Sequence, residues 1–88
     1  MFETTVCTFH LNIPFDEWVN KFDKDEVPAR EDMNIKVLFR GICKDNLHKA
    51  IVFVQAKEGV LCNKFRRISK HLKKNGADMS TAVPSLWT

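Results

Sequence analysis

The sequence predicts an α+β domain whose elements follow the order strand, helix, strand, strand, helix, strand. Three observations support this order. Stretches rich in β-branched and aromatic residues indicate strands, apolar residues spaced three and four apart indicate two helices, and turn or capping residues separate them. At 88 residues the chain has room for one domain, residues 1–88. Two helices on one face of four antiparallel strands make the split-βαβ, or ferredoxin-like, unit.

The first third of the chain predicts a strand and a helix. Residues 3–11 have strand composition, and Pro14 suits the first turn of a helix because its missing N–H has no partner there. The apolar residues of this helix share one face: Phe15, Trp18, Val19 and Phe22. Pro28 would interrupt a continuous helix, so we expect a broken or second short helix between residues 23 and 32.

The middle of the chain predicts a hairpin, with strands over residues 35–43 and 49–56 and a turn at Asp45-Asn46. If Lys44 pairs with Leu47, this register decides which residues of the two strands share each face of the sheet. We expect the first face to pack on the helices: Ile35, Val37, Phe39, Gly41, Ala50, Val52 and Val54. We expect the second face to be apolar with polar residues set into it: Lys36, Leu38, Arg40, Ile42, Ile51, Phe53 and Gln55.

The last part of the chain predicts a helix over residues 58–75 and a short strand over 81–88. The apolar residues of the helix recur at helical spacing: Leu61, Phe65, Ile68 and Leu72. Gly76 can take the left-handed conformation that ends a helix. Pro84 cannot donate a hydrogen bond to a ladder, so the last strand should lie at an edge of the sheet or pair only on the side away from that nitrogen.

An uncovered second hairpin face would be a larger apolar patch than a soluble monomer normally carries. We therefore expect a second copy of the chain to cover it in a symmetric homodimer. The residues expected at this interface are Leu38, Ile42, Ile51 and Trp87. The register of the hairpin decides which face this is, and the sequence leaves that register open.

Four blocks of the sequence together resemble a family of short, uncharacterised cyanobacterial proteins: ETTVCTF (residues 3–9), FDEW (15–18), LFRG (38–41) and QAKEG (55–59). That family is grouped with the dimeric α/β-barrel proteins, whose relatives include the antibiotic-biosynthesis-type monooxygenases. The resemblance covers nearly the whole chain. It implies the ferredoxin-like fold and a homodimer with a cavity between sheet and helices, and it implies no established activity.

Arg40 and Gln55 are the first candidates for binding a ligand. The guanidinium of Arg40 could bind a carboxylate, enolate or phosphate, or it could form an interface salt bridge with its stem packed on apolar neighbours. Phe53 lies on the same predicted face. Trp18 and Phe22 are either core residues or walls of a pocket for a flat ligand.

His10 is the candidate acid–base residue, since histidine titrates near neutral pH and His10 alternates with Thr8 and Val6. The alternative is an ordinary solvated histidine. His48 and His71 have no partner at a metal-ligand spacing, so no metal site is expected. No cofactor is expected either.

The three cysteines, Cys7, Cys43 and Cys62, are widely spaced and suit free thiols in a reducing compartment. The N-terminus has no secretory signal pattern, and no apolar run is long enough to span a membrane. We therefore expect a cytoplasmic protein that does not bind membranes.

The charge is distributed unevenly. Residues 1–32 hold eight acidic and three basic residues, a net charge of −5, whereas residues 33–88 hold three acidic and eleven basic residues, a net charge of +8. The basic residues concentrate in the second helix: Lys64, Arg66, Arg67, Lys70, His71, Lys73 and Lys74. We expect the acidic first helix beside it to supply the opposite charge. Nucleic-acid binding is not expected, because no aromatic platform for bases accompanies the charges.

Two hypotheses on function follow from these observations. The first is a homodimeric small-molecule-binding protein for an apolar or aromatic ligand, with cofactor-independent monooxygenase or isomerase activity as its enzymatic form. The second is a non-catalytic interaction module that binds an acidic partner or nucleic acid through its basic second helix. No catalytic signature in the sequence identifies a substrate or decides whether the protein is an enzyme.

Overall fold

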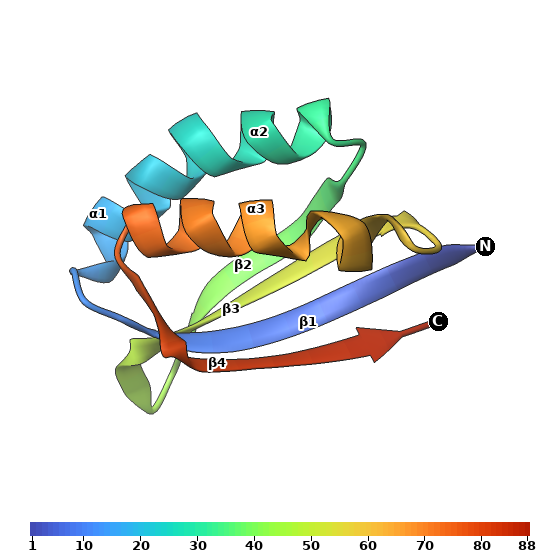
Figure 1. The fold of residues 1–88 in the computed structure, drawn as a ribbon. Helices are drawn as coiled ribbons and strands as arrows, with labels where there is room; N and C mark the ends of the chain where they lie inside the picture. The colour runs from blue at the N-terminus through green and yellow to red at the C-terminus, as the bar shows by residue number, and fades with distance from the viewer.

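A four-stranded antiparallel sheet carries every helix on one of its faces in the computed structural model, which describes all 88 residues (Figure 1). The strands are β1 (Phe2–Leu11), β2 (Lys36–Cys43), β3 (Asn46–Lys57) and β4 (Ala77–Trp87). The helical segments are α1 (Phe15–Lys21), the π-helical η1 (Phe22–Glu26), α2 (Val27–Asp32) and α3 (Val60–Lys74). The strand order is β2-β3-β1-β4. The predicted ferredoxin-like fold is confirmed.

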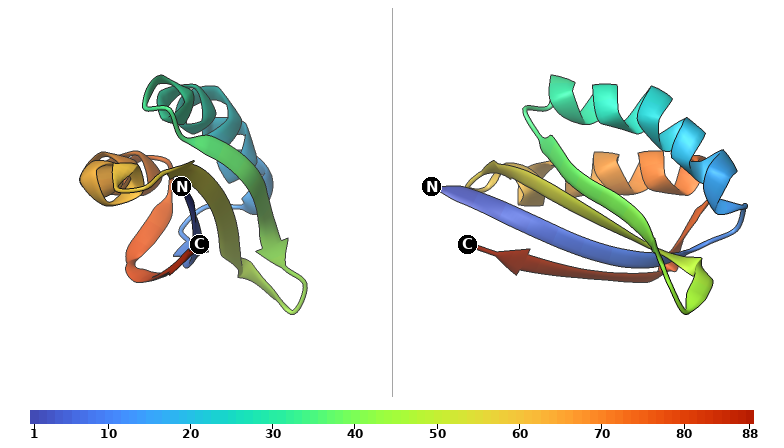
Figure 2. Two further views of the ribbon diagram at one scale, coloured as in Figure 1. Left: turned by 90° about the vertical axis from the view of Figure 1, so that its right-hand side faces the viewer. Right: turned by 180° about the vertical axis from the view of Figure 1, so that it is seen from behind.

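The sheet is twisted, and its edges lie under different helices (Figure 2). β4 is an edge strand, as Pro84 predicted, although it begins at Ala77, four residues before the predicted start. The helical segments α1, η1 and α2 follow one another without a loop and contact β2 and β3, whereas α3 contacts β3 and β4. No helix has both the length and the apolar character needed to cross a membrane.

The predicted break near Pro28 takes the form of the π-helical segment η1. Pro28 stands in the first turn of α2, directly after it. Four residues of this helical stretch follow one another at intervals of four and are all buried: Trp18, Phe22, Glu26 and Arg30. In a regular α-helix such a series would drift by about 40° per step. The wider π turn offsets this drift, so two charged residues continue the buried line that two aromatic residues begin.

A β-bulge in β2 reverses the predicted faces of its second half. Val37 lies opposite Val54, as predicted, but Phe39 lies opposite Phe53, so Leu38 is an extra residue. Because side chains alternate along a strand, every later side chain of β2 changes face. The prediction is therefore wrong for four residues: Phe39 and Gly41 lie on the open face, and Arg40 and Ile42 lie on the helix side.

The hairpin turn also differs from the prediction. Cys43 lies opposite Asn46, so the turn residues are Lys44 and Asp45, and the expected pair of Lys44 with Leu47 does not form. The register shifts a second time between Ile42 and Cys43. Two irregularities within one hairpin increase its local twist and bend β2 along the helices.

Trp18 and Phe22 belong to the core. Both side chains are fully buried, and the Trp18 ring lies 5.0 Å from the Phe22 ring and 5.8 Å from the Phe9 ring, measured between centroids. Edge-on and tilted arrangements of this kind are favourable for aromatic pairs. Of the two roles that the sequence left open for these residues, the structure shows the packing role.

Gly76 joins α3 to β4 in a conformation that suits glycine alone, with φ of +104°. A Cβ atom built on Gly76 would lie 2.7 Å from the Ile13 side chain. We expect Gly76→Ala to lower the free energy of unfolding by about 1–3 kcal/mol or more, through backbone strain and this clash. Urea unfolding measures the change.

Gly59 provides the matched control. Its φ is +86°, but nothing lies within 4 Å of a Cβ built there. Gly59→Ala should therefore cost only the backbone strain, about 1–2 kcal/mol. Equal losses in the two variants would contradict a role for the contact between Gly76 and Ile13.

Candidate functional site

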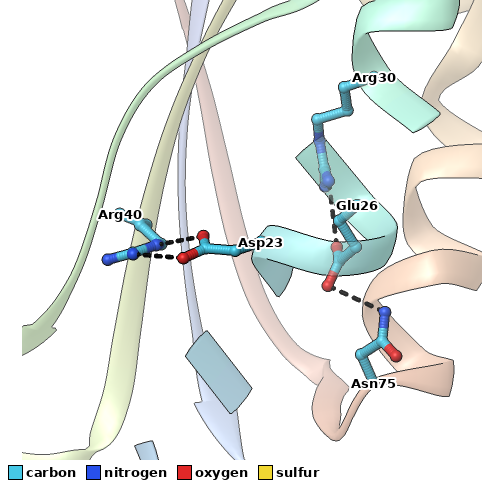
Figure 3. Close-up of polar contacts among 5 residues, drawn as sticks. All are labelled: Asp23, Glu26, Arg30, Arg40 and Asn75. Atoms are coloured by element: carbon cyan, nitrogen blue, oxygen red, sulfur yellow. Dashed lines mark hydrogen bonds and ion pairs between the residues drawn. The ribbon is translucent and has the colours of Figure 1, made fainter. Parts of the chain in front are cut away.

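Three polar side chains are buried together between the helices and the sheet (Figure 3). Arg30 is 1% exposed, and its Nη1 donates a 3.1 Å hydrogen bond to Oε1 of Glu26. Asn75, the residue after α3, donates from Nδ2 to Oε2 of Glu26 over 3.2 Å. The Arg30 guanidinium also lies 5.1 Å from the centre of the Phe22 ring. Both oxygens of Glu26 are thus bonded.

The Glu26 carboxyl is out of reach of water, and this changes its titration. Burial raises the pKa of Glu26 above its ordinary value, although the charge of Arg30 and the hydrogen bonds from Arg30 and Asn75 act in the opposite direction. Removing a carboxylate from water costs several kcal/mol, which a single neighbouring charge offsets only in part. Separating Glu26 from Arg30 should therefore destabilise the protein.

An inner cavity of about 40 Å³ lies beside this cluster. Its lining comes from β1, β3, β4, α2 and α3: Thr5, Cys7, Arg30, Val52, Leu61, Phe65, Ile68, Ser69, Leu72 and Met79. Two buried polar atoms of this lining, Nε of Arg30 and Oγ of Ser69, have no hydrogen-bond partner. A buried donor or hydroxyl without a partner costs about 1–3 kcal/mol. The cavity has room for about one water-sized group.

Cys7 also lines the inner cavity. Burial raises the pKa of its thiol, so the thiol is neutral near pH 7. The Cys7 Sγ makes one weak contact, 3.9 Å from the carbonyl oxygen of Thr8. Cys7 thus contributes a soft, weakly polar wall to the cavity.

A larger outer pocket of about 340 Å³ adjoins the inner cavity between α3 and β4. The two spaces share Thr5, Leu61 and Phe65. The other residues that line the outer pocket are Cys62, Pro84, Ser85 and Leu86. Its volume falls in the range of small-molecule sites, and most of its lining is apolar. We name the two spaces together the α3–β4 site: an apolar outer pocket and a smaller, mostly apolar inner cavity whose lining includes Arg30 and Ser69.

Arg40 lies away from the α3–β4 site. Its Nε and Nη2 donate to Oδ1 and Oδ2 of Asp23 over 2.8 and 2.7 Å, a bidentate pair that links β2 to η1 (Figure 3). These hydrogen bonds hold the pKa of Asp23 below its ordinary value. The expectation that Arg40 shares a face with Gln55 is wrong, because the bulge at Leu38 turns Arg40 to the helix side. Its salt bridge lies within the chain.

The other predicted site residues lie on the open sheet face. Gln55 donates from Nε2 to Oγ1 of Thr4 over 3.5 Å, and the Phe53 ring meets the Phe39 ring edge-on, 5.8 Å between centroids. His10 is exposed on β1, opposite Lys49 of β3 and Asp78 of β4. The structure therefore distributes the predicted residues among the core, the β2–η1 contact and the open face. It does not gather them in one pocket.

The sequence did not predict Arg30 or Ser69 as residues of a site. One signal was present: Glu26 and Arg30 continue the four-residue spacing of Trp18 and Phe22. A charged pair in the line of a buried helix face indicates a buried ion pair. Ser69 and Cys7 give no such signal, because a small polar residue beside apolar ones is common in any helix or strand.

The open sheet face lies opposite the helices and carries apolar side chains among polar ones such as His10 and Gln55. By their register, its apolar side chains are Phe2, Val6, Phe39, Ile51, Phe53, Val83 and Trp87. Ile51 and Trp87 lie there, as the predicted interface requires. Ile42 does not, because it lies on the helix side and lines a groove with Leu11 and Leu47. Leu38, in the bulge, is 44% exposed.

A sequence model of the family described as "Domain of unknown function (DUF3764)" matches residues 2–88. The chain belongs to this family. The search of curated proteins finds no match. Among solved structures, the DUF3764 chain is similar to a NIPSNAP family protein of unknown function from Agrobacterium tumefaciens, with a TM-score of 0.71 and 7% identity over 98% of this chain and 86% of that one.

Two further solved structures share the fold of this DUF3764 domain. A NIPSNAP-like protein from Burkholderia xenovorans matches with a TM-score of 0.67 and 10% identity, over 99% of this chain and 84% of that one. SnoaB, a cofactor-independent oxygenase from Streptomyces nogalater, matches with a TM-score of 0.60 and 14% identity, over 99% and 91%. At these identities the similarity shows a shared fold. It does not assign a function.

Proposed function

We propose that this DUF3764 protein is a homodimeric small-molecule-binding protein whose ligand occupies the α3–β4 site. The observation that carries the proposal is the pair of unpartnered polar atoms, Nε of Arg30 and Oγ of Ser69, at the inner end of an otherwise apolar site. A ligand with an apolar body would fill the outer pocket. One oxygen of that ligand would bond to both atoms in the inner cavity.

The charge of the site limits which kinds of ligand oxygen can bind there. Glu26 already neutralises Arg30 through a 3.1 Å hydrogen bond, so the inner cavity has no surplus positive charge. A carboxylate or phosphate would bring a second negative charge next to Glu26, which is costly in a buried place. A carbonyl, enol or hydroxyl oxygen can accept from Nε of Arg30 without that cost. The proposed ligand is therefore a small ketone, enol or phenol.

We extend the proposal to cofactor-independent oxygenase or isomerase chemistry on an enolisable ligand. The fold similarity to SnoaB supports this extension by analogy alone. What Arg30 can supply is a hydrogen bond to the oxygen of a neutral ketone or enol. His10 lies on the open face, outside this site.

The open sheet face is the reason for proposing a homodimer. Phe39, Phe53 and Trp87 form part of an apolar surface that no element of the chain covers. Contiguous apolar surface of this kind typically marks an interaction site. A second copy placed face to face would bury it by symmetry, because an isologous contact pairs the same patch on both subunits.

Ser69→Ala separates ligand binding from folding. Removing a buried hydroxyl that has no partner should leave the free energy of unfolding unchanged or raise it by up to about 1 kcal/mol. The same change removes a ligand contact, so affinity for a bound ketone or phenol should fall about tenfold. A thermal-shift screen of small ketones, enols and phenols identifies the probe, and calorimetry with that probe measures both variants.

Ser80→Ala is the matched control, since Ser80 is exposed and its hydroxyl bonds only to Asp78. It should leave ligand affinity unchanged. The proposal loses its support if no compound of the screen binds, or if Ser69→Ala binds the probe as tightly as the unaltered protein.

A further inference from the structure

α3 presents a basic surface that has no acidic partner in the protein. We define the basic face of α3 by seven residues: Lys64, Arg66, Arg67, Lys70, His71, Lys73 and Lys74. The three salt bridges of the structure, Lys21–Glu17, Arg30–Glu26 and Arg40–Asp23, all lie elsewhere. α3 does contact η1, as expected for helices that lie side by side, but no ion pair joins the acidic and basic helices.

The centre of the basic face is hollowed. Arg67, Lys70, His71 and Lys74 alone line a surface depression of about 350 Å³. These residues are three and four positions apart, so their side chains are neighbours on one stripe of the helix. Like charges at this spacing destabilise a helix. A negatively charged partner that fits between these side chains would relieve that repulsion.

We propose that the basic face of α3 is a docking surface for an acidic segment of another protein. The opposite face of α3 packs Leu61 and Leu72 into the core, so the helix has no free apolar face to insert into a membrane. The basic face also lacks an aromatic side chain for base stacking, because Phe65 lies on the other side of α3, at the outer pocket.

The acidic helical stretch beside α3 limits the shape of the partner. α1, η1 and α2 lie on the same side of the sheet as α3 (Figure 2). Their exposed acidic residues are Asp16, Glu17, Asp23, Asp25, Glu31 and Asp32. The acidic residues of this stretch disfavour a broad polyanion, such as a duplex or a membrane surface, that extends beyond α3. A narrow acidic segment can follow the 15 residues of α3, about 22 Å, and avoid them.

This surface is separate from the α3–β4 site and from the open sheet face. The basic face of α3 points away from the sheet, so a homodimer formed through the open face leaves it accessible. The proposal therefore does not depend on the proposed function.

The test measures binding of a 20-residue glutamate-rich peptide by fluorescence anisotropy at low salt. The variant Arg66→Gln/Arg67→Gln/Lys70→Gln/Lys74→Gln should bind about tenfold more weakly, which is the effect expected from losing four exposed ion pairs. The control Lys24→Gln/Lys44→Gln/Lys49→Gln/Lys57→Gln removes the same charge from exposed positions outside α3 and should bind like the unaltered protein. Salt at ~0.15 M should weaken peptide binding by every variant.

Four outcomes would overturn the proposal. The first is equal peptide binding by the unaltered protein and the α3 variant, and the second is equal weakening in the control. The third is tighter binding to a 20-nucleotide single-stranded DNA or to anionic vesicles than to the peptide. The fourth is a salt-sensitive higher oligomer that the α3 variant abolishes, which would make the acidic helix of a second copy the partner.

Discussion

Arg30→Met should lower the free energy of unfolding by about 3–5 kcal/mol near neutral pH, because it leaves Glu26 buried without its opposite charge. Methionine keeps much of the side-chain volume, so the loss of stability comes mainly from the unpaired charge of Glu26 and less from a cavity. Urea unfolding followed by circular dichroism measures it. For a domain of 88 residues this is a large part of the total stability.

The pH dependence of Arg30→Met identifies its cause. Without Arg30, the pKa of Glu26 should rise further above its ordinary value, since Arg30 is the main group that lowers it. A carboxyl whose pKa is raised in the folded state binds its proton more tightly there. It therefore favours folding below its ordinary pKa, and that contribution is lost as pH rises through the folded-state pKa. The variant should lose less stability at about pH 5 than at about pH 8.

Glu26→Gln/Arg30→Met is the control for this experiment. It removes both charges together, and the amide carbonyl introduced in place of the Glu26 carboxylate can still accept the hydrogen bond from Nδ2 of Asn75. We expect this double variant to recover most of the lost stability, because neutral replacement of a buried ion pair is often tolerated. A double variant as unstable as Arg30→Met, or a pH-independent loss, would contradict the buried ion pair as the cause.

Phe53→Asp should convert the expected homodimer to a monomer. In an isologous dimer the change appears twice, so two carboxylates would be buried without partners. At several kcal/mol in total, the dimer should dissociate about 1,000-fold more readily. Phe53 is half-buried in the single chain, and the new side chain can reach water there, so the monomer should stay folded. Sedimentation velocity measures the mass, and circular dichroism checks the fold.

Leu47→Asp is the matched control for the interface. Leu47 is an exposed apolar residue, 69% exposed, at the start of β3 and outside the open-face patch. The same charge introduced there should leave the dimer intact. A monomeric unaltered protein at about 50 µM, well above the dissociation constant of most stable dimers, would refute the homodimer directly.

The sequence alone determined the order of the elements and the buried faces of the helices. Trp18 and Phe22, and likewise Leu61 and Leu72, were predicted from a spacing that the helix itself imposes. The sequence also predicted that Gly76 ends α3 at positive φ and that Pro84 lies in an edge strand. Each depends on the backbone freedom of one residue, which does not change with the rest of the fold.

The faces of β2 were decided by tertiary structure. Both of its faces are rich in apolar residues, so the sequence pattern contains no sign of an extra residue at Leu38. That single residue moves Arg40 from the open face to a contact with Asp23, and it places Phe39 beside Phe53. A strand pattern of period two cannot reveal a bulge when both registers bury apolar side chains.

The α3–β4 site was also decided by tertiary structure. Arg30, Cys7 and Ser69 come from α2, β1 and α3, and only the packing of the helices on the sheet brings them to one cavity. Local spacing predicts which side of a helix is buried. It does not predict which buried polar atoms remain without a partner, because that depends on the positions of atoms far apart in the chain.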